Sequence, residues 1–155
     1  MIMLCGIPTS GKSTYVKQLK ETKEWSDAVV LSTDNYIERE AVSLCKTYNE
    51  IFEDAIKEAE QALQQDLKNA IRSGLDLIWD QTNLTSKART RKLKIIPGSY
   101  ECSCAYSVID LDTALQRNQN RLGKIIPENI LKRMHSQFEL PTTNEGFNYV
   151  KEIKV

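Results

Sequence analysis

The chain has 155 residues, and its 21 lysines and arginines balance its 21 aspartates and glutamates, so the formal net charge is zero. This length is typical of one domain, and a hydrophobic fraction of 41% supports a folded core and excludes a disordered chain. Zero net charge excludes a protein that binds nucleic acid over its whole surface, but it leaves room for a local basic patch.

The N-terminal run Met1–Ile7 is apolar but short, and it lacks the basic leader and cleavage site of a signal peptide. No apolar run approaches the roughly 18 residues of a membrane helix. We therefore expect a cytoplasmic protein without membrane contact. The four cysteines form no CxxC pair and are expected to be buried thiols. Cys102 and Cys104 share one strand face, but the chain offers too few further ligands for a metal site there.

Short apolar runs alternate along the chain with segments of helical spacing. The longest of these segments, 48–71, repeats apolar residues along one face and ends before Gly74. Strands that alternate with helices need crossover connections, so the sequence predicts a three-layer α/β fold with a parallel sheet of about five strands, in a single domain spanning 1–155. Strands are expected at 1–5, 28–31, 75–80, 100–109 and 147–155, and helices at 12–20, 36–44, 48–71, 85–96, 111–121 and from 127.

The segment 6–13 fits the pattern G-x-x-x-x-G-K-[ST] between an apolar strand and a helix, which is a strong phosphate-loop signal. Its glycines let backbone N–H groups turn inward around a phosphate, and the helix that follows directs its N-terminal dipole at the same anion. Lys12 is expected to reach the β- and γ-phosphates, and Ser13 to offer its hydroxyl to Mg²⁺. The sequence thus predicts that a nucleoside triphosphate, ATP or GTP, binds with Mg²⁺. The predicted contacts are Gly6, Ile7, Pro8, Thr9, Ser10, Gly11, Lys12, Ser13 and Thr14.

Two aspartates follow the second and third predicted strands, at the sheet edge where ligands of such folds bind. Asp34 is placed to accept the proton of an incoming hydroxyl group and to orient its attack. Alternatively, it caps the helix that follows. Asp80 ends an apolar strand, as a Walker-B aspartate does, and is expected to hold Mg²⁺ through water or to bind the acceptor. Thr82 and Asn83 come just after it and complete the predicted acceptor side.

Two basic segments are further candidates. Arg117 and Arg121 are four residues apart, so on one helix they face the same way. In a lid above the phosphates they would neutralise charge on the transferred phosphoryl group, whereas the alternative is a basic helix end that complements its own dipole. The run 87–94 is either a solvated helix face or a contact for an anionic acceptor such as a nucleic-acid backbone, with Arg89 the favoured residue.

Together these segments resemble the kinase domain of phage polynucleotide 5′-hydroxyl kinases, within the P-loop kinases that also include zeta-toxin-like proteins. The resemblance covers nearly the whole chain. It is carried by 6–14, 32–36, 80–89 and 108–127, and the last of these runs from a strand through R-N-x-x-R into a lid and a helix that starts at a proline.

The resemblance implies roles for particular residues. It implies Asp34 as the general base, Lys12 and Ser13 as the phosphate-loop pair, and Arg121 as the lid arginine that stabilises the transition state, with Arg117 in the same arm. It also implies that the acceptor is the 5′-hydroxyl end of RNA or DNA.

Three functions therefore compete. The first is Mg²⁺-dependent transfer of the ATP γ-phosphate to a polynucleotide 5′-hydroxyl. The second is a P-loop kinase that phosphorylates a hydroxyl of a small metabolite or nucleotide derivative. In its favour, Ile37 stands where the resembled family carries the arginine that binds the acceptor's phosphate. The third is a nucleotide-dependent switch, which is disfavoured because the chain has no NKxD motif and a lid arginine within the same chain suits transfer.

Overall fold

A computed structural model describes residues 1–154, in which five strands alternate with six α-helices and one 3₁₀ helix. The elements are β1 (Ile2–Cys5), α1 (Lys12–Glu21), β2 (Val29–Leu31), α2 (Thr33–Ser43), α3 (Tyr48–Arg72), β3 (Leu77–Asp80), α4 (Ser86–Leu93), β4 (Ser103–Tyr106), α5 (Leu111–Gln119), α6 (Glu128–Ser136), η1 (Thr143–Glu145) and β5 (Tyr149–Glu152).

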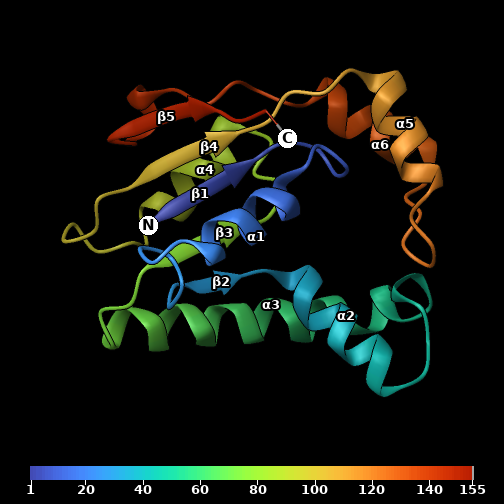
Figure 1. Cartoon of the computed structure of the whole chain (residues 1–155), viewed down its shortest axis with the longest axis horizontal. Helices are drawn as coiled ribbons and strands as arrows, with labels where there is room; N and C mark the ends of the chain where they lie inside the picture. The colour runs from blue at the N-terminus through green and yellow to red at the C-terminus, as the bar shows by residue number, and fades with distance from the viewer. Residues whose placement is uncertain (155) are drawn as a thin grey trace.

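The strands form one parallel sheet in the order β2-β3-β1-β4-β5, which confirms the predicted fold class. Figure 1 shows α1 in front of the sheet and α4 behind it. Because every strand runs the same way, the segments that follow the strands meet at one edge of the sheet, on the right of Figure 1. That edge carries the candidate site.

Strand β1 lies at the centre of the sheet and is buried on both faces. Ile2 and Leu4 pack with α1, whereas Met3 and Cys5 belong to the larger cluster that includes α3 and α4. This explains why the strand reads as a continuous apolar run rather than as an alternating one. The phosphate loop therefore starts from a central strand whose four residues are all buried.

Helices α2 and α3 form an antiparallel pair beside β2. Their contact is apolar, with Ile37 and Ala41 of α2 packed against Ile51, Ala55 and Ala59 of α3. The pair brings the start of α3 near the end of α5, as Figure 1 shows where the orange loop descends toward the teal connection.

Helix α2 begins three residues earlier than predicted, and its N-cap is Ser32, whose side chain accepts a hydrogen bond from the Asn35 N–H. The alternative reading of Asp34 as the cap is therefore wrong, because one preferred cap residue already precedes it. Asp34 lies in the first turn, where a carboxylate also complements the helix dipole.

Two other expectations need correction. The predicted strand 100–109 is confined to Ser103–Tyr106, since the chain turns at Pro97–Tyr100 before it. Of the four cysteines, three are buried, as predicted, but Cys45 is exposed at the tip of the α2–α3 connection. Val155, the last residue of the predicted closing strand, lies outside the described residues.

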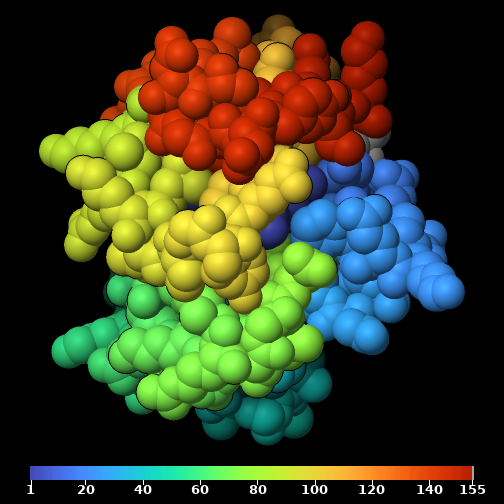
Figure 2. Space-filling view, turned by 90° about the vertical axis from the view of Figure 1, so that its left-hand side faces the viewer, coloured from blue at the N-terminus to red at the C-terminus, as the bar shows by residue number. Residues whose placement is uncertain are grey.

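The end of the sheet opposite the site is closed by the N-terminus. The Met1 ammonium donates to the Glu101 carbonyl at 2.8 Å. Figure 2 shows these dark-blue residues between the yellow segment before β4 and the lighter blue segment after α1. Within residues 1–154, no helix is both long and apolar enough to cross a membrane.

The buried ion pair between Arg89 and Glu145 fastens α4 to η1. The Arg89 side chain is fully buried, and its guanidinium donates to both Glu145 carboxylate oxygens at 2.6 and 2.7 Å. A third nitrogen donates to the carbonyls of Asn83, Leu84 and Glu139. Burial alone would lower the pKa of Arg89, because it disfavours the charged guanidinium. The hydrogen bonds to Glu145 outweigh this effect, so the pKa of Arg89 is raised.

Breaking this pair should destabilise the fold. We expect Glu145→Gln to lower the free energy of unfolding by about 3 kcal/mol, because it leaves a buried guanidinium without its counter-charge. Urea denaturation followed by circular dichroism measures this. The matched control is Glu128→Gln, which removes an exposed pair with Lys132 and should change stability by less than about 0.5 kcal/mol. Equal effects of the two substitutions would contradict the structural role.

Candidate phosphotransfer site

In the loop between β1 and α1, neighbouring atoms lie too close to Gly6 to leave room for a side chain. Gly6 has a φ of +147°, and a Cβ at this position would lie 2.7 Å from Ser10 Oγ and 2.8 Å from the Ser107 carbonyl oxygen. The Gly6 N–H donates to the Thr82 carbonyl at 2.9 Å, which joins the loop to the end of β3. Only glycine fits this close approach.

The loop has the donors that a phosphate group needs. Helix α1 begins at Lys12, and its N-cap Gly11 is in a left-handed conformation and provides no side-chain cap, so the first N–H groups of the helix have no side-chain partner. The Ser10 Oγ and Arg121 Nη1 atoms are buried and have no hydrogen-bond partner in the described residues. Ser13 and Thr14 are exposed in the first turn of α1. This arrangement fits an anion at the helix N-terminus.

The Lys12 ammonium lies inside the loop, where it donates to the Gly6 and Ile7 carbonyls, both at 2.9 Å. Burial lowers its pKa, whereas the carboxylates of Asp80 and Asp34 act in the opposite direction and Arg121 adds to the lowering. These mutual effects show that the four charged groups share one site. Burial also raises the pKa of Asp80, which Lys12 partly offsets.

No group of three or more His, Cys, Asp or Glu side chains within 1–154 is arranged to hold a metal ion. A magnesium ion at a phosphate loop needs no such cluster, because it keeps several waters and binds few protein ligands beside the phosphates. Ser13, the predicted magnesium ligand, is exposed at the start of α1, and Asp80 lies near Lys12 at the same edge.

Asp34 lies across from the loop and has two partners. Its Oδ1 accepts a hydrogen bond from the Tyr48 hydroxyl at 2.8 Å, and its Oδ2 lies 2.7 Å from the Lys124 ammonium. Burial would raise the pKa of Asp34, but Lys124 and then Tyr48 outweigh it, so the pKa lies below its usual range. The carboxylate is therefore charged at neutral pH, as a group that receives a hydroxyl proton must be.

The two lid arginines reach the phosphate loop from different segments. Arg117 lies in α5, and its Nη1 donates to the Thr9 carbonyl at 3.2 Å. Arg121 lies beyond the end of α5, so the prediction of one helix with both arginines was wrong. A turn at Asn120 nevertheless directs Arg121 toward Lys12 and Asp34, whose pKa values it influences.

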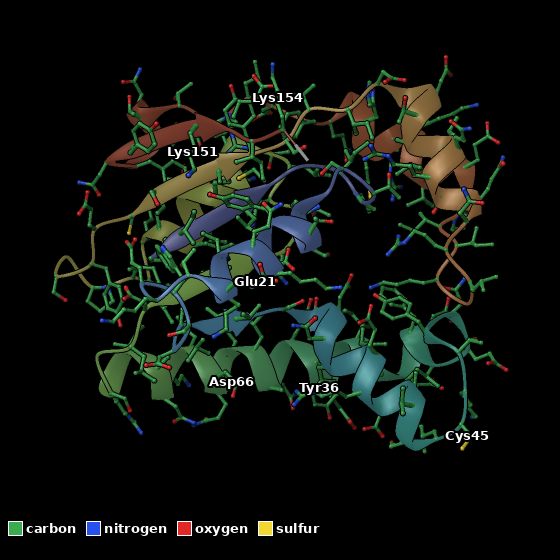
Figure 3. All side chains as sticks on the ribbon, in the orientation of Figure 1. Glu21, Tyr36, Cys45, Asp66, Lys151 and Lys154 are labelled. Carbon is green, nitrogen blue, oxygen red and sulfur yellow. The ribbon has the colours of Figure 1, made fainter. Side chains whose placement is uncertain are left out.

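The segment 120–126, here called the lid loop, is closed over the site. Asn118 is buried and fastens the base of the lid loop, with its side chain paired to both the N–H and the carbonyl of Ile126. At the tip, the Asn49 backbone and side chain donate to the carbonyls of Gly123 and Ile125. Figure 3 shows side chains filling the space between this loop and the α2–α3 pair, while Cys45 points away.

Two predicted acceptor residues are part of the scaffold instead. Asn83 is buried in a left-handed conformation, and its amide donates to the Leu4 carbonyl at 2.7 Å. Arg89 is fully buried against Glu145, so the predicted contact with an anionic acceptor was wrong. Thr82 stays at the edge of the site, where its carbonyl accepts from Gly6.

Two hollows adjoin the site. A pocket of about 230 Å³ lies beside the loop at Ser10 and Ser107, with Arg117 at one side. A larger groove of about 620 Å³ runs between α2, α3 and β2. Glu38 lines this groove and also contacts Lys124, so the groove begins at the acceptor side.

Sequence reasoning missed the residues that surround Asp34. Tyr48 of α3 and Glu38 of α2 lie outside any motif, and Lys124 lies within the segment 108–127 but was given no role of its own. Only the position of Lys124 within the lid loop hinted at a role. The contact between α2 and α3 is what places Tyr48 beside Asp34.

The fold and this site define a P-loop domain of the kinase type. The described loop, the paired lid arginines and the aspartate opposite them follow that architecture. The chain belongs to the AAA_33 family, described as an AAA domain, whose profile matches residues 1–141.

Individual relatives agree with this class. The chain is 30% identical over 154 residues to an L-seryl-tRNA(Sec) kinase of Methanococcus maripaludis, and the match covers 96% of the chain and 56% of that protein. A Chloroflexus aurantiacus protein described as a kinase superposes with a TM-score of 0.70 at 19% identity, over 98% of the chain and 82% of its own length. A deoxyadenosine kinase of M. mycoides gives 0.57 at 15% identity, over 99% and 89%. The structures show the shared fold, and none singles out the phage polynucleotide kinase.

The close approach at Gly6 gives a test of the loop. We expect Gly6→Ala to weaken binding of a fluorescent ATP analogue by at least about tenfold, because its Cβ would displace Ser10 and the backbone of Ser107. The matched control is Gly98→Ala, where nothing lies within 4 Å of the added carbon. Unchanged affinity in the Gly6 variant, measured by titration, would show that the nucleotide binds elsewhere.

Proposed function

We propose that the chain transfers the γ-phosphate of ATP to a hydroxyl group of a small acceptor, with Mg²⁺ at Ser13. The observation that carries this proposal is a phosphate loop with a carboxylate across from it, since Asp34 is close enough to raise the pKa of Lys12 against the effect of burial, and Arg121 lowers the pKa of both groups. A nucleotide switch needs no such acceptor base.

Each residue of the site has its own role in the proposed transfer. Lys12 and Arg121 neutralise charge on the γ-phosphoryl group, and Arg117 holds the loop through Thr9. Bound Mg²⁺ would supply further neutralisation of the phosphate oxygens. Asp34 orients the acceptor hydroxyl and takes its proton. The new bond joins the acceptor oxygen to the γ-phosphorus, while the bond from that phosphorus to the β–γ bridging oxygen breaks and ADP leaves.

The acceptor side favours a small molecule over a polynucleotide end. Ile37, at the position of the acceptor arginine in polynucleotide kinases, is fully buried between α2 and α3. Arg89, the favoured basic contact, is buried as well. Near the acceptor, the carboxylates of Asp34 and Glu38 share the Lys124 ammonium, and the negative charge left over repels a phosphate backbone.

The pocket beside Ser10 and Ser107 is the proposed binding site for the nucleotide base. This pocket adjoins the loop on the side away from Asp34 and is bordered by Arg117. ATP and GTP are both candidates, and competition between them in the transfer assay measures the preference.

The decisive variant is Asp34→Asn. We expect it to lower phosphate transfer by about 10² or more, because it removes the base, while ATP binding stays largely unchanged. Transfer is measured with γ-labelled ATP and Mg²⁺ against nucleosides, amino alcohols, sugar acids, L-seryl-tRNA and 5′-hydroxyl oligonucleotides. Lys12→Ala serves as the blank for the phosphate loop.

Asp54→Asn is the matched control, since Asp54 lies on the exposed face of α3. Near-normal turnover of the Asp34 variant would show that this aspartate only complements its helix. Transfer of the label to 5′-hydroxyl oligonucleotides and to no other acceptor would support polynucleotide kinase activity and overturn the small-acceptor proposal.

A further inference from the structure

The Lys124 ammonium is enclosed by three groups from two helices. It lies 2.7 Å from Asp34 Oδ2 and 2.6 Å from Glu38 Oε1, both on α2. The ring of Tyr48, at the start of α3, lies beneath it with 4.4 Å between the nitrogen and the ring centroid. Two carboxylates and an aromatic face are the groups that bind an organic ammonium ion most strongly. We call Asp34, Glu38 and Tyr48 the ammonium cage.

The occupant of the cage comes from a distant part of the chain. Lys124 is 86 residues from Glu38 and lies in the lid loop, which is held at its tip by Asn49. Leu122 in the same loop is 96% exposed, so the loop buries little apolar surface. The cage therefore belongs to the packed helices α2 and α3, whereas its occupant belongs to the lid loop, which is anchored by hydrogen bonds of Asn49 and Asn118.

The cage is open to solutes. The Asp34 and Glu38 side chains are 51% and 52% exposed although Lys124 covers part of each. Solvent therefore reaches both carboxylates, although the Lys124 side chain itself is only 16% exposed. A free ammonium compound can replace Lys124 because it restores the same contacts.

The charges of the site point to the same kind of acceptor. Lys12, Arg117 and Arg121 gather on the phosphate side, whereas the acceptor side presents Asp34 and Glu38. This division attracts a cationic acceptor and repels an anionic one. Tyr48 donates to Asp34 Oδ1 and holds the carboxylate in place.

We propose that the ammonium cage selects an acceptor that carries a charged amino group next to its hydroxyl, and that Lys124 occupies the amino position while the lid loop is closed without acceptor. When the amino and hydroxyl groups are on neighbouring carbons, one carboxylate contacts both. Asp34 thus binds the amine and receives the hydroxyl proton, with Glu38 and Tyr48 as the residues that determine specificity. This inference rests on the proposed function.

Binding of a probe without a hydroxyl tests the cage independently of transfer. We would titrate L-alaninamide by calorimetry into the wild-type protein, Lys124→Met and the double variant Lys124→Met/Glu38→Gln, with propionamide as the neutral probe. Lys124→Met should bind L-alaninamide about tenfold more tightly than wild type, because the competing ammonium is gone, and the Glu38 change should reverse most of that gain. Propionamide should not bind.

Lys132→Met is the matched control, since Lys132 pairs with Glu128 on the surface of α6. It should leave L-alaninamide binding as in wild type. Equal binding to all variants, or none to any of them, would overturn the ammonium cage.

Transfer to paired acceptors then links the cage to the reaction. L-serinamide and 3-hydroxypropanamide differ only in the amino group. We expect kcat/KM to be at least about tenfold higher for L-serinamide, and Glu38→Gln to reduce this difference, mainly by raising the KM of L-serinamide. If Lys124→Met raises transfer to both acceptors equally, Lys124 is only a latch for the lid loop and the inference fails.

The two proposals fail in different ways. If L-alaninamide binding depends on Lys124 and Glu38 but no acceptor receives phosphate, the kinase proposal fails and the cage stands as a binding site. If only acceptors without an amine receive phosphate, the kinase proposal stands and the cage is overturned.

Discussion

The junction of β1 and β3 is the constraint on which the rest of the site depends. The Asn83 amide donates to the Leu4 carbonyl, and the Gly6 N–H donates to Thr82, so the two strand ends are joined where the phosphate loop begins. Arg89 Nη1 donates a hydrogen bond to the backbone carbonyl of Asn83, and Lys92 Nζ donates one to the side-chain oxygen of Asn83. Left-handed backbone at Asn83 costs free energy that this network offsets. The loop can therefore be tight without being mobile.

The sheet edge separates opposite charges across a short distance. Cations from α1, α5 and the lid loop surround the loop, and carboxylates from α2 and β3 face them. Lys12 lies between the two sides, which explains why burial lowers its pKa while Asp80 and Asp34 oppose that effect. In a transfer reaction, the phosphoryl group leaves the cations around the phosphate loop and moves toward the acceptor hydroxyl, whose proton a carboxylate on the opposite side receives. The arrangement is thus asymmetric in the direction that transfer requires.

The phosphate loop could be predicted from the sequence because its members lie within eight consecutive residues and bind through backbone geometry. The parallel sheet followed from the alternation of apolar runs and helices. The acceptor side could not be predicted in full, since Asp34, Tyr48 and Lys124 meet only when α2 packs on α3 and the lid loop closes. Arg89 was misread because a charged residue in a basic run is normally exposed, and its partner Glu145 is 56 residues away.

The ion pairs Arg89–Glu145 and Lys124–Asp34 differ in how readily their partners can separate. The bond of Arg89 to Glu145 is buried, so separating it would leave a charge without solvent or partner, and it holds α4 permanently. In the pair of Lys124 with Asp34, the Asp34 side chain is 51% exposed and the Lys124 side chain is 16% exposed, so a cation from solution can reach the carboxylate. Lys124 at Oδ2 and Tyr48 at Oδ1 each use one hydrogen-bonding position of Asp34 and lower its pKa, so the carboxylate stays charged and keeps free lone pairs. In the proposed reaction, exchange of Lys124 for the acceptor's ammonium leaves Asp34 charged and removes one contact of the lid loop in the same step, which links acceptor entry to the lid loop.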